Sequence, residues 1–310
     1  MANVRNQIIN LESVMMENKK MYKYDNFELK DMTVNEPIAL FKKQISIKPF
    51  LKWAGGKTQL IPELSKFIPN YYNKYIEPFI GGGAFFYHLN PHEAVISDST
   101  EELILTYNEI KNNVFEVINI LETYKNNEEF YYNIRSLKPQ EISKPERAAR
   151  LIYLNKTCFN GLYRVNKKGV FNVPYGKKNS NFLNKDLLLS ASEFLKDTKI
   201  LNLDYLEVLK EYSEINDFIF LDPPYYPVGK YSDFKRYTKE FFYHEDHILL
   251  KNEFDRLVNI GCNVLLTNSN HPFILDLYKD YEIISVNTKR MINSNAKERK
   301  GKDIIVIGIK

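Results

Sequence analysis

Short apolar runs that end in polar or glycine-rich turns recur along this 310-residue chain from Ile47 onward. The clearest of them are 75–77, 94–98, 200–204, 218–222 and 263–267. Such runs are typical of strands buried on both faces of a parallel sheet. Helical patterns, including 101–111 and 244–260, separate several of them, which predicts a doubly wound, Rossmann-like α/β domain. The last two β-rich runs, 281–289 and 303–309, have no helix between them and are expected to pair antiparallel.

The stretch 112–190 interrupts this alternation. It begins with helical patterns and becomes rich in Gly, Asn and Lys from 155 to 185, so we interpret it as an inserted, mainly helical domain with a β-hairpin. The main domain would then comprise 47–111 and 191–310. Residues 1–46 contain no glycine and are interpreted as a flexible or docked extension, with a partner-binding helix as the alternative.

Composition excludes several classes of protein. The chain is 44% hydrophobic and 26% charged, as ordinary globular proteins are. Two cysteines, Cys158 and Cys262, cannot form a disulfide framework and lack the spacing of a structural zinc site, so no metal is expected. No run of 18 apolar residues and no signal pattern is present, so we expect a cytoplasmic protein without a membrane partner.

Two glycine-rich loops compete for a nucleotide-like ligand. Residues 55–58, Gly-Gly-Lys-Thr, end like a P-loop, but that motif needs a glycine where Leu51 stands. Residues 77–83, Glu-Pro-Phe-Ile-Gly-Gly-Gly, follow a strand and open a helix, which favours this loop as the ligand site. Asp98 ends the next strand and can accept hydrogen bonds from ribose hydroxyls, or alternatively can cap the helix that follows.

The most apolar run ends in the tetrapeptide Asp-Pro-Pro-Tyr at 222–225. The two prolines cannot donate backbone hydrogen bonds and fix φ, so they present a rigid row of carbonyl acceptors beside the Asp222 carboxylate. Tyr225 adds a flat aromatic face. Together these groups indicate a site for a planar group that bears an amine.

With these motifs in this order, the chain resembles the Dam-like DNA adenine-N6 methyltransferases from about Pro49 to Lys310. The resemblance implies that Asp222, Pro223, Pro224 and Tyr225 are catalytic, with the base rotated out of the duplex. It implies S-adenosylmethionine as cofactor, bound by Trp53, Lys57, Glu77, Phe79, Gly81, Gly83, Asp98, Asp204, Tyr205 and Asp222.

Residues 155–164 and 172–176 resemble the DNA-reading hairpin of this family, and 165–170 would form its tip. The resemblance therefore makes the inserted domain a target-recognition domain for double-stranded DNA, at GATC or a related site. It implies DNA contacts for Lys52, Asn160, Leu162, Arg164, Asn166, Pro174 and Lys178. Arg164 is the candidate for a bidentate contact to guanine. Lys178 departs from the family, in which an aromatic residue is usual at that position.

Charge is concentrated in two segments. Residues 155–185 hold seven basic residues and no acidic one, and residues 287–302 hold six basic residues and Glu298. The formal net charge of the whole chain is only +4, so the rest of the chain is acidic on balance. Basic segments of this kind neutralise DNA phosphates.

Other interpretations stay open from the sequence. The same fold could act on cytosine N4, RNA or protein amides, although Ser or Asn in place of Asp222 would favour those substrates. A DNA-binding module or NTPase could use 55–58, and a catalytically dead regulator is a further alternative. His244 and His247 are interpreted as a solvated surface rather than a ligand site. A restriction endonuclease that acts on the same site is a conceivable partner.

Overall fold

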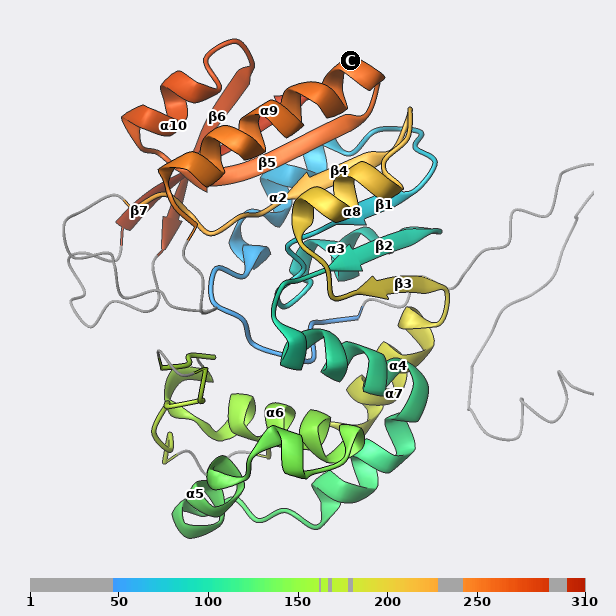
Figure 1. The fold of residues 1–310 in the computed structure, drawn as a ribbon, viewed down its shortest axis with the longest axis vertical. Helices are drawn as coiled ribbons and strands as arrows, with labels where there is room; N and C mark the ends of the chain where they lie inside the picture. Colours follow the sequence, from blue (N-terminus) through green and yellow to red (C-terminus); the bar gives the residue numbers. More distant parts are fainter. Residues whose placement is uncertain are drawn as a thin grey trace, which may run out of the picture. The chain divides into compact units, whose positions relative to one another are not determined.

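The computed structural model describes residues 47–161, 163–166, 169–177, 181–227, 242–289 and 300–309, all within one compact unit, Gln44–Lys310. Within these residues, seven strands form one sheet in the order β3-β2-β1-β4-β5-β7-β6 (Figure 1). The strands are β1 (Tyr75–Glu77), β2 (Ala94–Ser97), β3 (Thr198–Leu201), β4 (Phe218–Leu221), β5 (Asn263–Ser269), β6 (Glu282–Lys289) and β7 (Lys300–Gly308).

The pairing confirms the predicted mixed α/β architecture. β3, β2, β1, β4 and β5 are mutually parallel, whereas β7 runs antiparallel to both β5 and β6. The chain leaves β1 for β2 on one side and returns to β4 on the other side. The strand order therefore reverses between β1 and β4.

Helices cover both faces of the sheet. The helices of the described residues are α2 (Ile61–Leu64), α3 (Ala84–Leu89), α4 (Glu101–Glu122), α5 (Glu128–Ser136), α6 (Lys144–Thr157), α7 (Lys185–Leu195), α8 (Tyr205–Tyr212), α9 (His244–Ile260) and α10 (Pro272–Leu277). Two of them lie away from the sheet: α6 packs on α4, and α5 packs on α6 (Figure 1). Along β4, Phe218 and Phe220 belong to the hydrophobic cluster that includes α3 and α4, while Ile219 and Leu221 belong to the cluster of α8, α9 and α10. Because successive side chains of a strand point to opposite faces, a strand buried on both faces must be apolar throughout.

Two element boundaries differ from the prediction. The predicted helix 101–111 continues into the stretch 112–190 as the single helix α4, in which Asn113 has non-helical angles. Residue 112, the expected start of the inserted domain, therefore lies inside a helix. β3 begins at Thr198 and ends at Leu201, because Asp204 caps the N-terminus of α8 and the residues before it form the approach to that helix.

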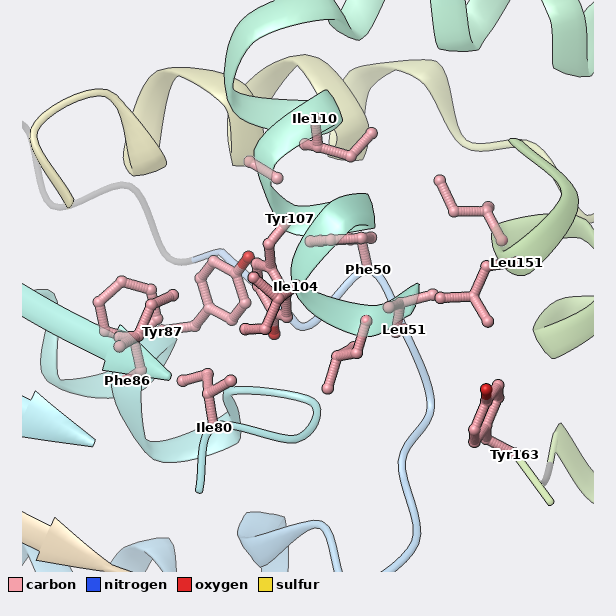
Figure 2. Packing of buried hydrophobic residues seen from close by; sticks show 14 of the residues in the cluster. Phe50, Leu51, Ile80, Phe86, Tyr87, Ile104, Tyr107, Ile110, Leu151 and Tyr163 are labelled. Atoms are coloured by element: carbon pink, nitrogen blue, oxygen red, sulfur yellow. The ribbon is translucent and has the colours of Figure 1, made fainter. Parts of the chain in front are cut away.

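The segment before the first short helix packs into the same hydrophobic cluster as α4 and α6. Phe50 packs edge-on against Tyr107 of α4 at a centroid distance of 5.2 Å, and Leu51 lies near Leu151 of α6 (Figure 2). Residues next to the glycine at 55 are thereby anchored to helices far along the chain. In the part of the chain that the structure describes, no helix is both long and apolar enough to cross a membrane.

Candidate active site

The carboxyl ends of the parallel strands bring the predicted motifs to one edge of the sheet. β1 ends at Glu77, β2 ends one residue before Asp98, and β4 ends one residue before Asp222. Ligands of open α/β sheets bind at this edge, where the strand order reverses. β1 and β4 are the strands at that reversal, and they deliver the glycine loop and the tetrapeptide.

Both carboxylate oxygens of Asp222 are engaged. Oδ2 lies 2.6 Å from the Lys57 ammonium, and Oδ1 accepts a hydrogen bond of 2.7 Å from the Thr267 hydroxyl. Burial raises the pKa of Asp222, and the Lys57 charge and the two hydrogen bonds act in the opposite direction without cancelling that rise. The side chain is 17% exposed, so it can still be reached by a ligand.

Lys57 lies between a carboxylate and an aromatic face. It begins the short 3₁₀ helix Lys57–Gln59, and its ammonium also donates to the Gly55 carbonyl. The same ammonium lies 4.6 Å from the centroid of the Tyr225 ring. A nitrogen with several N–H donors thus occupies the environment that the sequence predicted for an amine.

The glycine loop is shaped by backbone angles that favour glycine. Gly81 and Gly83 have φ of 47° and 68°, and a Cβ on Gly81 would stand 2.8 Å from Trp53 Cδ1. The Gly81 N–H donates to the Asp98 carboxylate at 3.1 Å, while its carbonyl accepts from Tyr107. The other Asp98 oxygen accepts the Thr100 N–H, but Thr100 rather than Asp98 is the N-cap of α4, so the alternative that Asp98 caps this helix is wrong.

Glu77 is buried at the end of β1 and accepts a hydrogen bond of 2.7 Å from the Tyr75 hydroxyl. Burial raises the pKa of Glu77 well above its usual range, and the nearby Asp222 charge adds to this effect. Burial likewise raises the pKa of Asp98. Three carboxyl groups with raised pKa values therefore line this edge, which is typical of functional sites.

Aromatic rings form a wall beside the glycine loop. Phe79 lies 5.1 Å from Tyr205, and Phe242 completes the group at 6.1 Å from Phe79 and 5.9 Å from Tyr205. Asp204 precedes Tyr205 and caps α8 by accepting the Leu206 N–H. The wall offers flat apolar faces at this edge of the sheet.

The predicted hairpin pairs antiparallel. Val165 bridges Phe171, and the Asn166 N–H donates to the Val170 carbonyl. Side chains alternate along its first arm: Tyr163 and Val165 are buried, and the residues between and after them are exposed. The predicted DNA-contacting residues that the structure describes all have exposed side chains: Lys52, Asn160, Arg164, Asn166 and Pro174.

Two contacts connect this hairpin to the glycine loop. Trp53 stacks on Tyr163 at a centroid distance of 4.7 Å and also packs against Gly81. The backbone of Lys52 is held by Asn155, whose side-chain amide accepts from the Lys52 N–H and donates to its carbonyl. Residues 52–53 therefore connect the predicted DNA-reading hairpin to the predicted ligand-binding loop.

The polar residues at the end of β5 were not predicted to belong to the site. Thr267, Asn268 and Ser269 are all buried and contact the tetrapeptide or Tyr226, which follows it. Three polar residues that end an apolar strand were the available signal. That signal could be interpreted only with the knowledge that β5 lies next to β4.

The interpretation of the two histidines was half wrong. His244 is exposed, but His247 is buried against Phe242, Tyr226 and Phe273, because it faces the sheet from the first turns of α9. Burial lowers the pKa of His247 to about 4. Of the predicted DNA contacts, Leu162 and Lys178 lie outside the described residues, as do the extension 1–46 and most of the basic segment 287–302.

Several known proteins are similar to this chain in sequence. Residues 53–292 match the family described as D12 class N6 adenine-specific DNA methyltransferase. A type II methyltransferase of Lactococcus lactis subsp. cremoris, M1.LlaDCHI, is 41% identical over 277 residues, which cover 86% of this chain and 97% of the relative. M.MjaIII, a type II methyltransferase of Methanocaldococcus jannaschii, is 41% identical over 279 residues, with coverages of 83% and 96%. The DNA adenine methylase of Haemophilus influenzae is 31% identical over 273 residues, with coverages of 86% and 95%.

Proposed function

Since this chain belongs to the D12 class of N6 adenine-specific DNA methyltransferases, we propose that it transfers a methyl group from S-adenosylmethionine to N6 of an adenine rotated out of duplex DNA. The observation that carries the proposal is the environment of Asp222. Its carboxylate and the Tyr225 ring already surround a nitrogen donor, the Lys57 ammonium.

The edge of the sheet fits the cofactor. The Tyr205 hydroxyl is buried with no hydrogen-bond partner among the described residues, so a ligand group can satisfy it. Asp98 would accept from ribose hydroxyls, and the rings of Phe79 and Tyr205 would bind the flat adenine of the cofactor. The remaining contacts would come from Trp53, Lys57, Glu77, Gly81, Gly83 and Asp204. When bound, S-adenosylmethionine supplies a methyl group on a sulfonium, and the sulfur keeps the electron pair of the bond that breaks.

The residues of the tetrapeptide prepare the nucleophile. The N6 lone pair of adenine is delocalised into the ring and must be freed before it can form a bond to carbon. The Asp222 carboxylate and the Pro223 carbonyl accept the two N6 hydrogens, which aims the lone pair, while Pro224 keeps the turn rigid and Tyr225 stacks on the base. One N6 hydrogen leaves as a proton toward Asp222. Positioning supplies most of the rate.

The target amine must replace Lys57 at Asp222 Oδ2. The ammonium is bound to that oxygen by charge and hydrogen bond, so the incoming amine competes with it. The base itself leaves the duplex at a cost of a few kcal/mol. The Lys57 contact thus favours the ionised form of the carboxylate.

We assign target recognition to 112–190 and catalysis to 47–111 and 191–310. Arg164 would contact guanine, and Lys52, Asn160, Leu162, Asn166, Pro174 and Lys178 would complete the interface at GATC or a related site. What supports this assignment is the exposed arm of the hairpin. Two relatives carry the name type II methyltransferase, so we further propose a cognate restriction endonuclease that acts on the same site. The enzyme would act where its DNA lies, in the bacterial cytoplasm or on phage DNA.

The test is methylation of plasmid DNA followed by digestion with enzymes that differ in sensitivity to methylated GATC. We expect protection and N6-methyladenine by mass spectrometry. Asp222→Ala should abolish both even at saturating S-adenosylmethionine, and Asp276→Ala, at an exposed acid paired with Lys279, should change neither. An Asp222→Ala enzyme with wild-type activity would refute the assignment of this site.

A further inference from the structure

Three consecutive buried polar residues end β5 beside the tetrapeptide: Thr267, Asn268 and Ser269. The Asn268 side-chain oxygen accepts the Tyr226 N–H at 3.0 Å, and the Ser269 hydroxyl donates to the Tyr226 carbonyl at 2.7 Å. Thr267 donates to Asp222 at the other end of the loop. The end of β5 therefore holds the tetrapeptide at its first residue, Asp222, and at Tyr226, which follows its last residue.

The loop needs support from outside itself. Pro223 and Pro224 have no N–H group, so neither can donate a hydrogen bond that would fix the backbone. The carboxylate of Asp222 could otherwise rotate, since the terminal torsion of an Asp side chain is broad. A hydroxyl donor on one oxygen favours one orientation of the carboxylate.

We propose that Thr267 is a positioning residue that reserves Asp222 Oδ2 for the target amine by occupying Oδ1. This inference rests on the proposed function, in which the amine of adenine binds at Asp222. The geometry divides the carboxylate into two oxygens with different partners: Oδ1 faces the Thr267 hydroxyl at 2.7 Å, and Oδ2 faces the Lys57 ammonium at 2.6 Å. Thr267 is fully buried and lies on the strand next to β4, so it holds its position without contacting DNA or cofactor itself.

The bond also affects the charge state of Asp222. A hydrogen bond to an ionised carboxylate favours the charged form, so its loss raises the pKa of Asp222 further. The charge of Lys57 on the 3₁₀ turn lowers the pKa of Asp222, and the charge of Asp222 in turn raises the pKa of Glu77 and Tyr75 on β1. None of these is changed by a substitution at Thr267.

The test compares Thr267→Val, which removes the hydroxyl and keeps the shape, with Thr267→Ser, which keeps the hydroxyl. In single-turnover methylation we expect Thr267→Val to slow methyl transfer by about tenfold, with the affinities for S-adenosylmethionine and DNA nearly unchanged. The acidic limb of its pH–rate profile should move to higher pH. Thr267→Ser should restore the rate and the profile.

The control is Thr106→Val, at a buried threonine whose hydroxyl donates to the Glu102 carbonyl within α4. It should leave the pH–rate profile unchanged. If Thr267→Val does not fold, the pair Thr267→Ser and Thr267→Ala gives the same comparison of hydroxyl present and absent. A Val or Ala variant with the wild-type rate and profile overturns the inference, and so does a Ser variant as slow as they are. The proposed function fails separately, if Asp222→Ala stays active.

Discussion

Lys57 is the residue whose charge most affects the candidate site. It is nearly buried, and its ammonium contacts Asp222, the Gly55 carbonyl and the face of Tyr225. A buried carboxylate without a counter-charge would bind a proton more readily. Lys57 therefore favours the charged form of Asp222, and in the proposed function it competes with the target amine for this carboxylate.

We predict that Lys57→Met, which keeps most of the side-chain stem, raises the pKa of Asp222 and moves the acidic limb of the methylation rate to higher pH. The rate should fall at a higher pH than the wild-type rate does as the solution is acidified, because the proposed mechanism needs an ionised carboxylate to accept N6 hydrogens. Single-turnover rates across a range of pH provide the measurement. Lys66→Met, at an exposed lysine paired with Glu63, is the matched control and should leave the profile as it is.

His247 makes stability depend on pH. Its pKa is lowered from 6.5 to about 4, so between these values the unfolded chain binds a proton that the folded chain does not. The free energy of unfolding should therefore be undiminished above about pH 6.5 and fall as the pH drops towards 4, by a total on the order of 3 kcal/mol. Urea unfolding at about pH 7 and pH 5 should show a smaller loss for His247→Gln than for wild type. His244→Gln, on the exposed face of the same helix, should lose as much free energy of unfolding between these pH values as the wild type. A loss of the same size in His247→Gln would contradict the explanation.

At the scale of elements, the loop between β1 and α3 depends on glycine geometry. Gly81 combines a left-handed φ of 47° with Trp53 so close that an added Cβ would stand 2.8 Å from its ring. The Gly81 N–H donates a hydrogen bond to Asp98, and the Gly81 carbonyl accepts one from the Tyr107 hydroxyl. Any displacement of this backbone moves the residues proposed to hold the cofactor.

Gly81→Ala should cost about 1–2 kcal/mol in the free energy of unfolding, from the left-handed backbone and the contact with Trp53. It should also weaken binding of S-adenosylmethionine by about tenfold, because 1.4 kcal/mol in binding free energy corresponds to a factor of ten. Urea unfolding and equilibrium dialysis measure the two effects. Gly56→Ala, at φ −50°, should have a smaller effect on both. An unchanged affinity of Gly81→Ala for S-adenosylmethionine would contradict the proposed role of this loop in cofactor binding.

At the scale of the whole molecule, positive charge is concentrated where DNA contact is proposed. The segment 155–185 is basic without any acid, on a chain whose net charge is only +4. Arg164 lies on the exposed side of the hairpin and is oriented by Asn172, whose side-chain oxygen accepts from its Nε. Lys177 is exposed beyond the other arm. The two residues should contribute differently, since base contacts specify and phosphate contacts position.

Arg164→Ala should reduce discrimination at one guanine of the target by ~1–3 kcal/mol, whereas Lys177→Ala should weaken binding to all sequences and lower the salt dependence. Methylation rates on duplexes with single substitutions in GATC test the first variant. Binding over a range of salt concentrations tests the second. Unchanged sequence preference in Arg164→Ala would remove this residue from target recognition.

Much of the fold could be predicted because local pattern and tertiary environment agree. β1, β4 and α9 follow the apolar runs and helical periodicity almost residue for residue. The boundaries that differed are those decided by neighbours. α4 continues past residue 111 because its buried face packs on α6 and α7, and β3 ends early because Asp204 begins a helix.

The amino-acid sequence by itself determined the α/β class, the order of the motifs and the tetrapeptide at 222–225, because strand period, glycine backbone angles and proline chemistry are local properties. Only the tertiary structure decided which groups meet. Lys57 and Asp222 are 165 positions apart, and Thr267 is a further 45 positions along the chain, yet Lys57 and Thr267 both lie within hydrogen-bonding distance of Asp222. The burial of His247 and the stacking of Trp53 on Tyr163 were decided in the same way. Such contacts depend on strand order and helix packing, which no local pattern encodes.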